Sequence, residues 1–254
     1  MQNNTPYAET YLKSHAAEGY GRRYKSTFEA GYYGIEWQHI ERPLLSKLVA
    51  QLDGIESCSC LDFACGTGRI TSLLAEHARQ VTGVDVSAAM LEMAQRRDNV
   101  QLFERNIIDH PLDKRYDLLT AFRFFVNAEP ELREAAMAAL AAHARPGARL
   151  IANVHVNSWS PMGLLYRTRN SLLRRTMNRT LSQAEFIDLA KRHGFEAEQT
   201  QWYGFTPRLG PLTFPGMQST MLAVESVGRH LPLIKPCLAQ SMVVVFRKLE
   251  MEEK

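Results

Sequence analysis

The chain has 254 residues, of which 45% are hydrophobic, which is typical of a globular protein and enough for one α/β domain with a large core. Its formal net charge of +3 is too small to indicate general affinity for nucleic acid. No apolar run approaches membrane-spanning length, and the N-terminus lacks the regions of a signal peptide, so we expect a cytoplasmic protein with no membrane partner.

Residues 7–52 are predicted to form helices joined by loops, and the spacing of Leu44, Leu45, Leu48 and Leu52 is helical. The same region is crowded with aromatic residues, which ordinary helix packing would explain: Tyr20, Tyr24, Tyr32, Tyr33 and Trp37.

The next segment, residues 60–71, is the most informative in the chain. An apolar strand at 59–63 leads into a turn of small residues, and a helix opens near Arg69. A second strand, 81–85, ends in Asp85. A strand, a tight turn, a helix and a strand tipped with a carboxylate are typical of a mononucleotide-binding half. The turn needs small residues because a ligand must contact the backbone there.

A dinucleotide fingerprint, Gly-x-Gly-x-x-Gly, does not fit this turn. Read from Ala64, its third glycine position falls on Arg69, where the helix must pack close to the strand. The pattern is instead Asp-x-Ala-Cys-Gly-Thr-Gly, which resembles motif I of the class I S-adenosylmethionine (SAM)-dependent methyltransferases. Gly-Val-Asp-Val-Ser-x-x-Met, at 83–90, resembles their second motif. The resemblance covers residues 58–157, with Ala64 in place of the first glycine of the usual loop.

The rest of the chain continues the alternation of strands and helices. Strands are predicted at 100–103, 116–122, 148–156, 195–205 and 240–248, and helices after Ser87, from Pro130 to Pro146-Gly147, and from a capping box at Ser182. This order predicts an α/β, doubly wound, mostly parallel sheet. The resemblance implies the seven-stranded class I methyltransferase fold, with the final strand antiparallel. Residues 1–52 would then be an N-terminal helical lid on a SAM-binding domain at 53–254.

Two segments, 157–181 and 206–236, do not fit the α/β pattern. Both follow strands at the expected ligand edge, so we interpret them as substrate covers inserted in the domain. The first carries a cluster of arginines that is either a solvated helix face or an attractant for a phosphate or carboxylate on the substrate: Arg167, Arg169, Arg174, Arg175 and Arg179.

The resemblance and the sheet topology together suggest cofactor-binding residues. A carboxylate that ends the second strand, Asp85, can accept hydrogen bonds from both ribose hydroxyls. The resemblance places the methionine end of SAM against Asp62, Ala64, Gly66 and Gly68, and the adenine against Val86, Met90, Asn106 and Ile107. Phe122 ends the fourth strand and Arg123 follows it. Arg123 would reach the cofactor carboxylate or an acidic substrate, with a surface ion pair as the alternative. Met90 could equally be core, and Asn106 an ordinary loop residue.

An aromatic lid is the second interpretation of the N-terminal tyrosines. The methyltransferases that the chain resembles often fold such a segment over the cofactor, where it excludes water. The resemblance implies that hydroxyls such as those of Tyr24 and Tyr33 would hold the cofactor carboxylate.

His155 is the candidate general base. In Asn153-Val-His-Val-Asn157, a period of two places Asn153, His155 and Asn157 on one face, at the carboxyl end of the fifth strand. A neutral imidazole there could take a proton from the methyl acceptor. The alternative is a histidine that orients substrate or satisfies backbone groups.

We therefore expect a SAM-dependent methyltransferase that acts on a small molecule through an oxygen or nitrogen, such as a sugar or secondary metabolite. No metal is expected, because the cysteines complete no metal-ligand pattern. The alternatives are an RNA or protein methyltransferase that docks through the arginine cluster, and a protein that binds SAM without catalysis.

Overall fold

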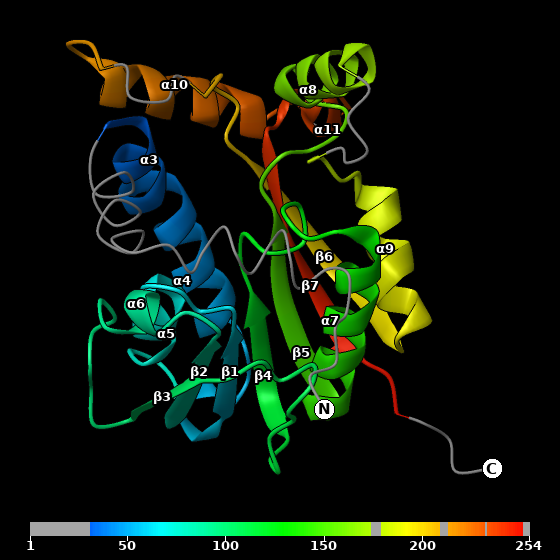
Figure 1. Ribbon diagram of the computed structural model, residues 1–254. Coiled ribbons are helices and arrows are strands. Elements are labelled where there is room, and N and C mark those ends of the chain that lie inside the picture. The colour runs from blue at the N-terminus through cyan, green and yellow to red at the C-terminus, as the bar shows by residue number, and fades with distance from the viewer. Residues whose placement is uncertain (1–30, 174–178, 209–212, 232, 251–254) are drawn as a thin grey trace.

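The computed structural model describes residues 31–173, 179–208, 213–231 and 233–250 (Figure 1). Its seven strands form one sheet in the order β3-β2-β1-β4-β5-β7-β6. They are β1 (Ser59–Phe63), β2 (Gln80–Asp85), β3 (Val100–Glu104), β4 (Tyr116–Ala121), β5 (Ala144–Val154), β6 (Phe195–Tyr203) and β7 (Ser241–Lys248). Strand β7 is antiparallel to both of its neighbours, and the other pairs are parallel. The predicted doubly wound sheet with an antiparallel final strand is confirmed.

Helices cover both faces of this sheet. From residue 31 on, the N-terminal helical segment forms α3 (Gly31–Glu36), a π-helical turn η2 (Trp37–Glu41) and α4 (Arg42–Ala50). A short 3-10 turn, η3 (Ile55–Ser57), leads into β1. The domain then adds α5 (Arg69–Leu74), α6 (Ala88–Leu91), α7 (Pro130–His143) and α9 (Gln183–Arg192). The two segments predicted to be covers contain α8 (Pro161–Leu172), α10 (Met217–Arg229) and α11 (Lys235–Leu238).

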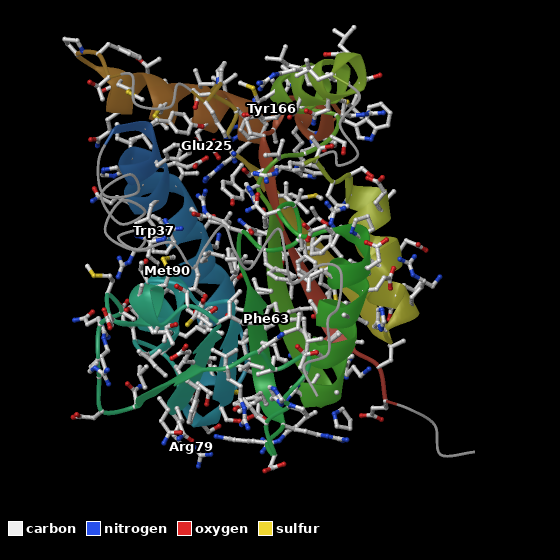
Figure 2. All side chains as sticks on the ribbon, viewed as in Figure 1. Trp37, Phe63, Arg79, Met90, Tyr166 and Glu225 are labelled. Atoms are coloured by element: carbon white, nitrogen blue, oxygen red, sulfur yellow. The ribbon has the colours of Figure 1, made fainter. Side chains whose placement is uncertain are left out.

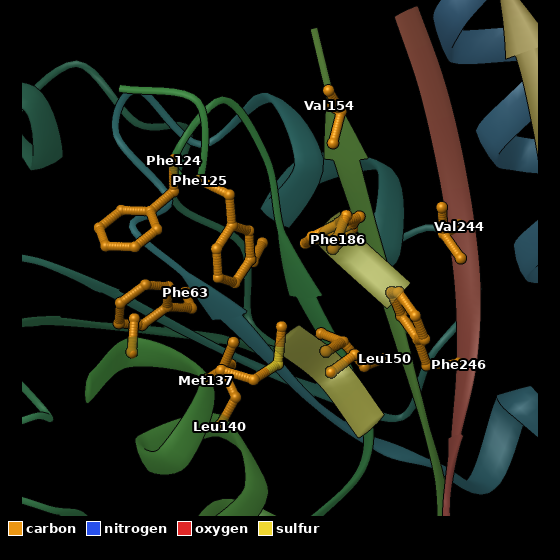
Figure 3. Packing of buried hydrophobic residues seen from close by; sticks show 14 of the residues in the cluster. Phe63, Phe124, Phe125, Met137, Leu140, Leu150, Val154, Phe186, Val244 and Phe246 are labelled. Atoms are coloured by element: carbon orange, nitrogen blue, oxygen red, sulfur yellow. The ribbon is translucent and has the colours of Figure 1, made fainter. Parts of the chain in front are cut away.

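One face of the sheet packs against α7 and α9 through a row of phenylalanines (Figure 3). Consecutive rings of Phe63, Phe124, Phe125, Phe186 and Phe246 have centroids 4.8 to 5.4 Å apart, mostly edge to face. Each ring buried in this way stabilises the fold by about 1.5 to 3 kcal/mol relative to an exposed ring. The row extends from β1 to β7 and therefore ties the strand before the turn to the antiparallel strand.

The other face packs against α3, α4, α5 and α10. Its core includes Tyr32, Leu48, Leu73, Met217 and Met221. Helix α10 lies in one of the predicted cover segments, so this segment is part of the hydrophobic core and not a loose flap.

Three strands were predicted to extend one or two residues past their observed ends, each for a local reason. Strand β4 stops before Phe122 because Arg123 adopts a left-handed backbone (φ +58°). Strand β5 stops at Val154, since the next carbonyl, that of His155, accepts from the side chains of Arg208 and Ser241. Strand β6 stops at Tyr203, because the next two amides donate to the carboxylate of Glu225.

The predicted end of the helix at Pro146-Gly147 is also wrong. Helix α7 ends at His143, and β5 begins at Ala144. The imidazole of His143 accepts a hydrogen bond from the amide of Leu112 (2.9 Å) and its other nitrogen lies 2.6 Å from the carbonyl of Ala139, which fixes the helix end. Gly147, at φ +74°, then lies in the strand near a register shift against β4.

Both predicted helix starts at serines are present. Ser182 forms the full capping box with Glu185, as predicted. Ser87 occupies the N-cap position of α6, but its side chain accepts no capping hydrogen bond from that helix.

The carboxyl ends of the parallel strands meet at one edge of the sheet, where ligands of open α/β sheets bind. Strand β6 also ends at this edge, because it and β5 are both antiparallel to β7. Figure 2 shows Glu225 of α10 and Tyr166 of α8 at this end of the molecule, far from Arg79 at the other end. Both predicted cover segments therefore lie on the ligand edge.

Candidate functional site

The turn between β1 and α5 is built from left-handed residues. Ala64, Gly66 and Gly68 have φ values of +53°, +55° and +77°. A Cβ atom on Gly68 would come within 2.9 Å of the Cβ of Ala94, and one on Gly66 within 3.1 Å of the Met90 methyl group. Small residues are thus required for the turn to pack against α6 and its following residues. Ala64 tolerates the left-handed conformation at a cost of about 1 kcal/mol.

Asp85, at the end of β2, is held by two backbone amides. Its Oδ2 accepts from Gly66 N (2.8 Å) and its Oδ1 accepts from Ser87 N (2.9 Å). The side chain is partly exposed. A carboxylate fixed at the end of the second strand, beside a turn of small residues, fits the ribose diol of an adenosyl cofactor.

Asp62 lies beneath the turn and is fully buried. Its two oxygens accept from the hydroxyls of Thr71 (2.6 Å) and Thr120 (2.8 Å), which joins β1 to α5 and β4. Burial raises the pKa of this carboxyl to about 6, although the two threonine hydrogen bonds oppose the shift. Asp62 therefore supports the turn from below, and its contact with the cofactor stays a prediction.

The other predicted cofactor residues differ in burial and in their hydrogen-bond partners. Val86, Phe122 and Tyr33 are partly buried, whereas Met90 and Ile107 are buried, with Ile107 in the phenylalanine-row core. The Asn106 amide donates to Asp109 (2.7 Å) and accepts from Ile108 N (3.2 Å), so it closes its own turn. Tyr24, Arg174 and Arg175 lie outside the described residues.

Arg123 belongs to a buried polar cluster instead of a surface ion pair. Its Nη2 atom lies 3.5 Å from Glu41 Oε2 and 3.7 Å from Glu36 Oε2, and both carboxylates are 1% exposed. Glu41 Oε1 also accepts from the Tyr203 hydroxyl (2.7 Å) and from the Asn153 amide (3.3 Å). We call these five residues the Arg123 cluster. It joins the N-terminal helical segment to the ends of β4, β5 and β6.

The two carboxyls of the Arg123 cluster have opposite pKa shifts. Burial raises the pKa of Glu36. Burial also acts on Glu41, but the charges of Arg123 and Arg69 and the Tyr203 hydrogen bond outweigh it, so the pKa of Glu41 is lowered. Glu36 is thus the carboxyl of the pair that more readily carries a proton.

His155 lies beside this cluster. Its side chain is buried, and its Nδ1 atom has no hydrogen-bond partner among the described residues. Burial, and then the charges of Arg208 and Arg123, hold the pKa of His155 well below 6.5. The imidazole is therefore neutral at physiological pH and is placed to accept a hydrogen bond.

The predicted polar face of the fifth strand is only partly present. Asn153 lies in β5, whereas His155 and Asn157 both follow its end. Asn153 and His155 lie near Arg123. The Asn157 amide donates to the carbonyls of Pro236 (2.6 Å) and Ala239 (3.1 Å) and so holds α11.

Sequence reasoning missed several residues at this edge. They come from segments that share no motif: Glu36, Glu41, Tyr203, Arg208 and Glu225. A usable signal was the pair Glu36 and Glu41, each of which follows an isoleucine in a predicted helix. A carboxylate that is buried in this way requires a partner.

Known proteins that are similar to this chain in sequence are methyltransferases. Residues 60–147 match the family model described as a methyltransferase domain. The cypemycin N-terminal methyltransferase of Streptomyces is 30% identical over 118 residues, 44% of each chain. The 2-phytyl-1,4-naphtoquinone methyltransferase of Nostoc is 37% identical over 73 residues, 24% of this chain and 32% of that protein. The chain thus matches less than half the length of these curated relatives.

Among solved structures, a magnesium protoporphyrin IX methyltransferase from Synechocystis, with bound S-adenosylhomocysteine, superimposes with a TM-score of 0.65. The match covers 94% of this chain and 98% of that one at 15% identity. The chain therefore has the class I methyltransferase fold, and the part that matches the methyltransferase family model is residues 60–147.

Proposed function

We propose that this protein is a SAM-dependent methyltransferase that acts on a small-molecule acceptor. The observation that carries the proposal is the pair of hydrogen bonds that fixes the Asp85 carboxylate against the Gly66 amide and the start of α6. This arrangement presents acceptors for a ribose diol beside a turn that a ligand can approach closely. The family model across residues 60–147 supports the same activity.

Bound SAM would supply an activated methyl group on a sulfonium, which is already a good leaving group. The chain then has to hold the acceptor in line and exclude water, which can supply most of the rate. Asp85 and the turn would orient the cofactor. The neutral His155 imidazole, with its unpartnered Nδ1, would accept the proton of a hydroxyl or protonated amine.

The proposed acceptor site lies between the Arg123 cluster and the two inserted segments. Arg123 is already balanced by Glu36 and Glu41, so it is a poor receptor for an acidic acceptor. Arg208, whose Nη2 atom donates to the His155 carbonyl, is the better candidate for a carboxylate or phosphate on the substrate. Small-molecule pockets are typically enclosed in this way, with a few polar groups that fix orientation.

Calorimetry with SAM, S-adenosylhomocysteine and NAD tests the cofactor. We expect binding of the two adenosyl ligands and none of NAD; binding of NAD alone would reject the proposal. Transfer of a labelled methyl group from SAM into fractions of a cell extract then tests catalysis. Incorporation into low-molecular-mass fractions is expected, whereas tight SAM binding with no turnover on any fraction would favour a non-catalytic role.

A further inference from the structure

Helix α8 presents an apolar face away from the rest of the protein. Gly163, Tyr166 and Asn170, spaced three and four residues apart, face inward: Gly163 packs on the Asn157 carbonyl and Tyr166 on the phenylalanine-row core. The opposite side carries Leu165 and Leu172, which are 58% and 84% exposed. A helix in a monomeric protein normally buries its apolar face, so this one is unpaired on its outward side.

More exposed apolar side chains lie on α11, next to α8. Asn157 holds both elements, because its carbonyl contacts Gly163 and its amide donates to Pro236 and Ala239. Leu233, just before α11, is 92% exposed. Figure 1 shows α8 and α11 together at one end of the molecule. We call this surface the apical face; its exposed apolar residues are Trp159, Leu164, Leu165, Leu172, Leu173, Leu233, Ile234 and Leu238.

The apical face is also basic. Arg169 lies beside Leu165 and Leu172 on the surface of α8, whereas Arg167 lies on the other side of the helix. Both arginines are exposed, with the Arg167 guanidinium 5.2 Å from the centre of the Trp159 ring. The two inserted segments, 157–181 and 206–236, hold eight of the 30 Lys and Arg residues of the chain but one of its 27 Asp and Glu residues. That acid, Glu225, is buried and paired with Arg229.

Arg208 donates to the His155 carbonyl and Arg229 pairs with Glu225, so the described arginines that the apical face presents on α8 are Arg167 and Arg169. Outside the two segments the chain has 26 acidic residues against 22 basic ones. Exposed leucines with exposed arginines on the same helix, and no acid among them, are typical of a helix that lies in the plane of a membrane interface. Leucines there enter the acyl boundary and basic side chains contact anionic headgroups.

We propose that the apical face docks on the surface of a bilayer that contains anionic lipids. A second copy of the chain fits less well, because an isologous contact would bring the arginines of two apical faces together without acids between them. RNA fits less well because aliphatic leucines offer nothing to phosphates or bases.

This contact would be peripheral. Among residues 31–173, 179–208, 213–231 and 233–250, no helix is both long enough and apolar enough to span a bilayer. The expectation of no membrane partner rested on spanning segments, and a surface contact requires none. Because the apical face adjoins the carboxyl edge of the sheet, a docked molecule would turn that edge toward the bilayer.

Co-sedimentation of the full chain with vesicles tests the proposal. We expect binding to phosphatidylcholine vesicles that contain about 30% phosphatidylglycerol, weak binding to phosphatidylcholine alone, and loss of binding as salt rises. Leu172→Glu should lower the apparent affinity roughly ten-fold or more, since burial of one leucine is lost and a like charge is added. Phe103→Glu, at an exposed apolar position on β3 away from α8, is the matched control and should bind as wild type does.

Arg169→Gln tests the charge, with Arg96→Gln on the exposed surface before β3 as its control. We expect only Arg169→Gln to weaken binding to the anionic vesicles. All these positions are exposed, so thermal unfolding should stay unchanged. Failure of the wild-type chain to bind either vesicle overturns the proposal. Equal weakening of vesicle binding by Phe103→Glu also overturns it. Two further outcomes do so when vesicles are not bound: a dimer that Leu172→Glu dissociates, or RNA binding that Arg169→Gln abolishes.

Discussion

The Asp85 carboxylate supports the turn as well as the ribose that we propose it binds, because it accepts from the amides of Gly66 and Ser87. We expect Asp85→Ala to weaken SAM binding by roughly 1.5 to 3 kcal/mol, the cost of losing hydrogen bonds to a charged group. Calorimetric titration measures this. Two amides also lose their acceptor, so a stability loss of about 1 to 2 kcal/mol should accompany it. Asp98→Ala, on the exposed surface, is the control; an unchanged dissociation constant for Asp85→Ala would show that the ribose is held elsewhere.

His155 should matter for turnover and not for cofactor affinity. If its imidazole is the base, His155→Ala should lower the transfer rate on the order of 10²-fold at neutral pH. If it only positions the acceptor, the loss should appear as weaker acceptor binding, which His155→Gln would restore in part. A mutant with wild-type turnover removes His155 from the mechanism.

The pH–rate profile separates these roles further. Burial and the charges of Arg208 and Arg123 lower the pKa of His155, so the imidazole loses its proton well below pH 6.5. The rising limb of the rate should therefore lie below pH 6.5, with a plateau at neutral pH. Arg208→Gln removes one of the two charges and should move the limb toward higher pH. An unshifted limb would indicate that another group titrates.

At the scale of elements, α10 is locked to the end of β6. Gly228 packs against the Phe205 ring, where a Cβ atom would lie 2.3 Å from a ring carbon. We expect Gly228→Ala to displace α10 at a cost of about 1 to 3 kcal/mol. If the segment walls the acceptor pocket, KM for the acceptor should rise while SAM affinity stays within a few-fold.

Ser219→Ala, on the exposed side of α10, is the control for this variant. Kinetics with the identified acceptor and thermal unfolding provide the two readouts. Unchanged acceptor kinetics in a measurably destabilised Gly228→Ala protein would show that α10 does not wall the pocket. A point variant is needed here because Met217 and Met221 lie in the core, so that excision of residues 206–236 would damage the fold itself.

The strands and the turn were predictable because their signals are local. An apolar run that ends in Asp62 and a small-residue turn, or a serine followed three residues later by Glu185, can be recognised within one segment. The ends of β5 and β6 were not predictable, because their next carbonyl or amide is satisfied by Arg208 or Glu225 from a distant segment. The Arg123 cluster was missed for the same reason: each of its residues is ordinary in its own segment, and only the fold joins them.

At the scale of the whole molecule, Asp62 should make stability depend on pH. Its pKa is about 6 in the folded protein and about 3.9 in an unfolded chain. Between these values the folded state binds a proton that the unfolded state has released, so the free energy of unfolding falls as pH rises from about 4 to 6, by up to about 3 kcal/mol. Above pH 6 the dependence from this group ends.

Asp62→Asn removes this titratable group, so the free energy of unfolding should depend less on pH between about 4 and 6. Denaturant unfolding of wild type and variant at intervals from pH 4 to 7 gives the difference. Glu36 and Glu225, whose pKa values are also raised by burial, contribute the same sign in both proteins and cancel. Asp113→Asn, at an exposed position, should leave the wild-type curve unchanged. Parallel curves for wild type and Asp62→Asn would show that Asp62 has an ordinary pKa.

The π-helical turn between α3 and α4 has a consequence for tolerance to deletions. Its hydrogen bonds join residues five apart, which stacks Glu36 and Glu41 on one side of the helix, where both reach Arg123. Loss of one codon within Trp37–Glu41 would restore α-helical bonding and rotate everything before it by about 100°. Arg123 would then keep one carboxylate instead of two. This helix can accept single substitutions, but the number of residues in it is constrained. Related chains should therefore differ here in residue identity, without insertions or deletions.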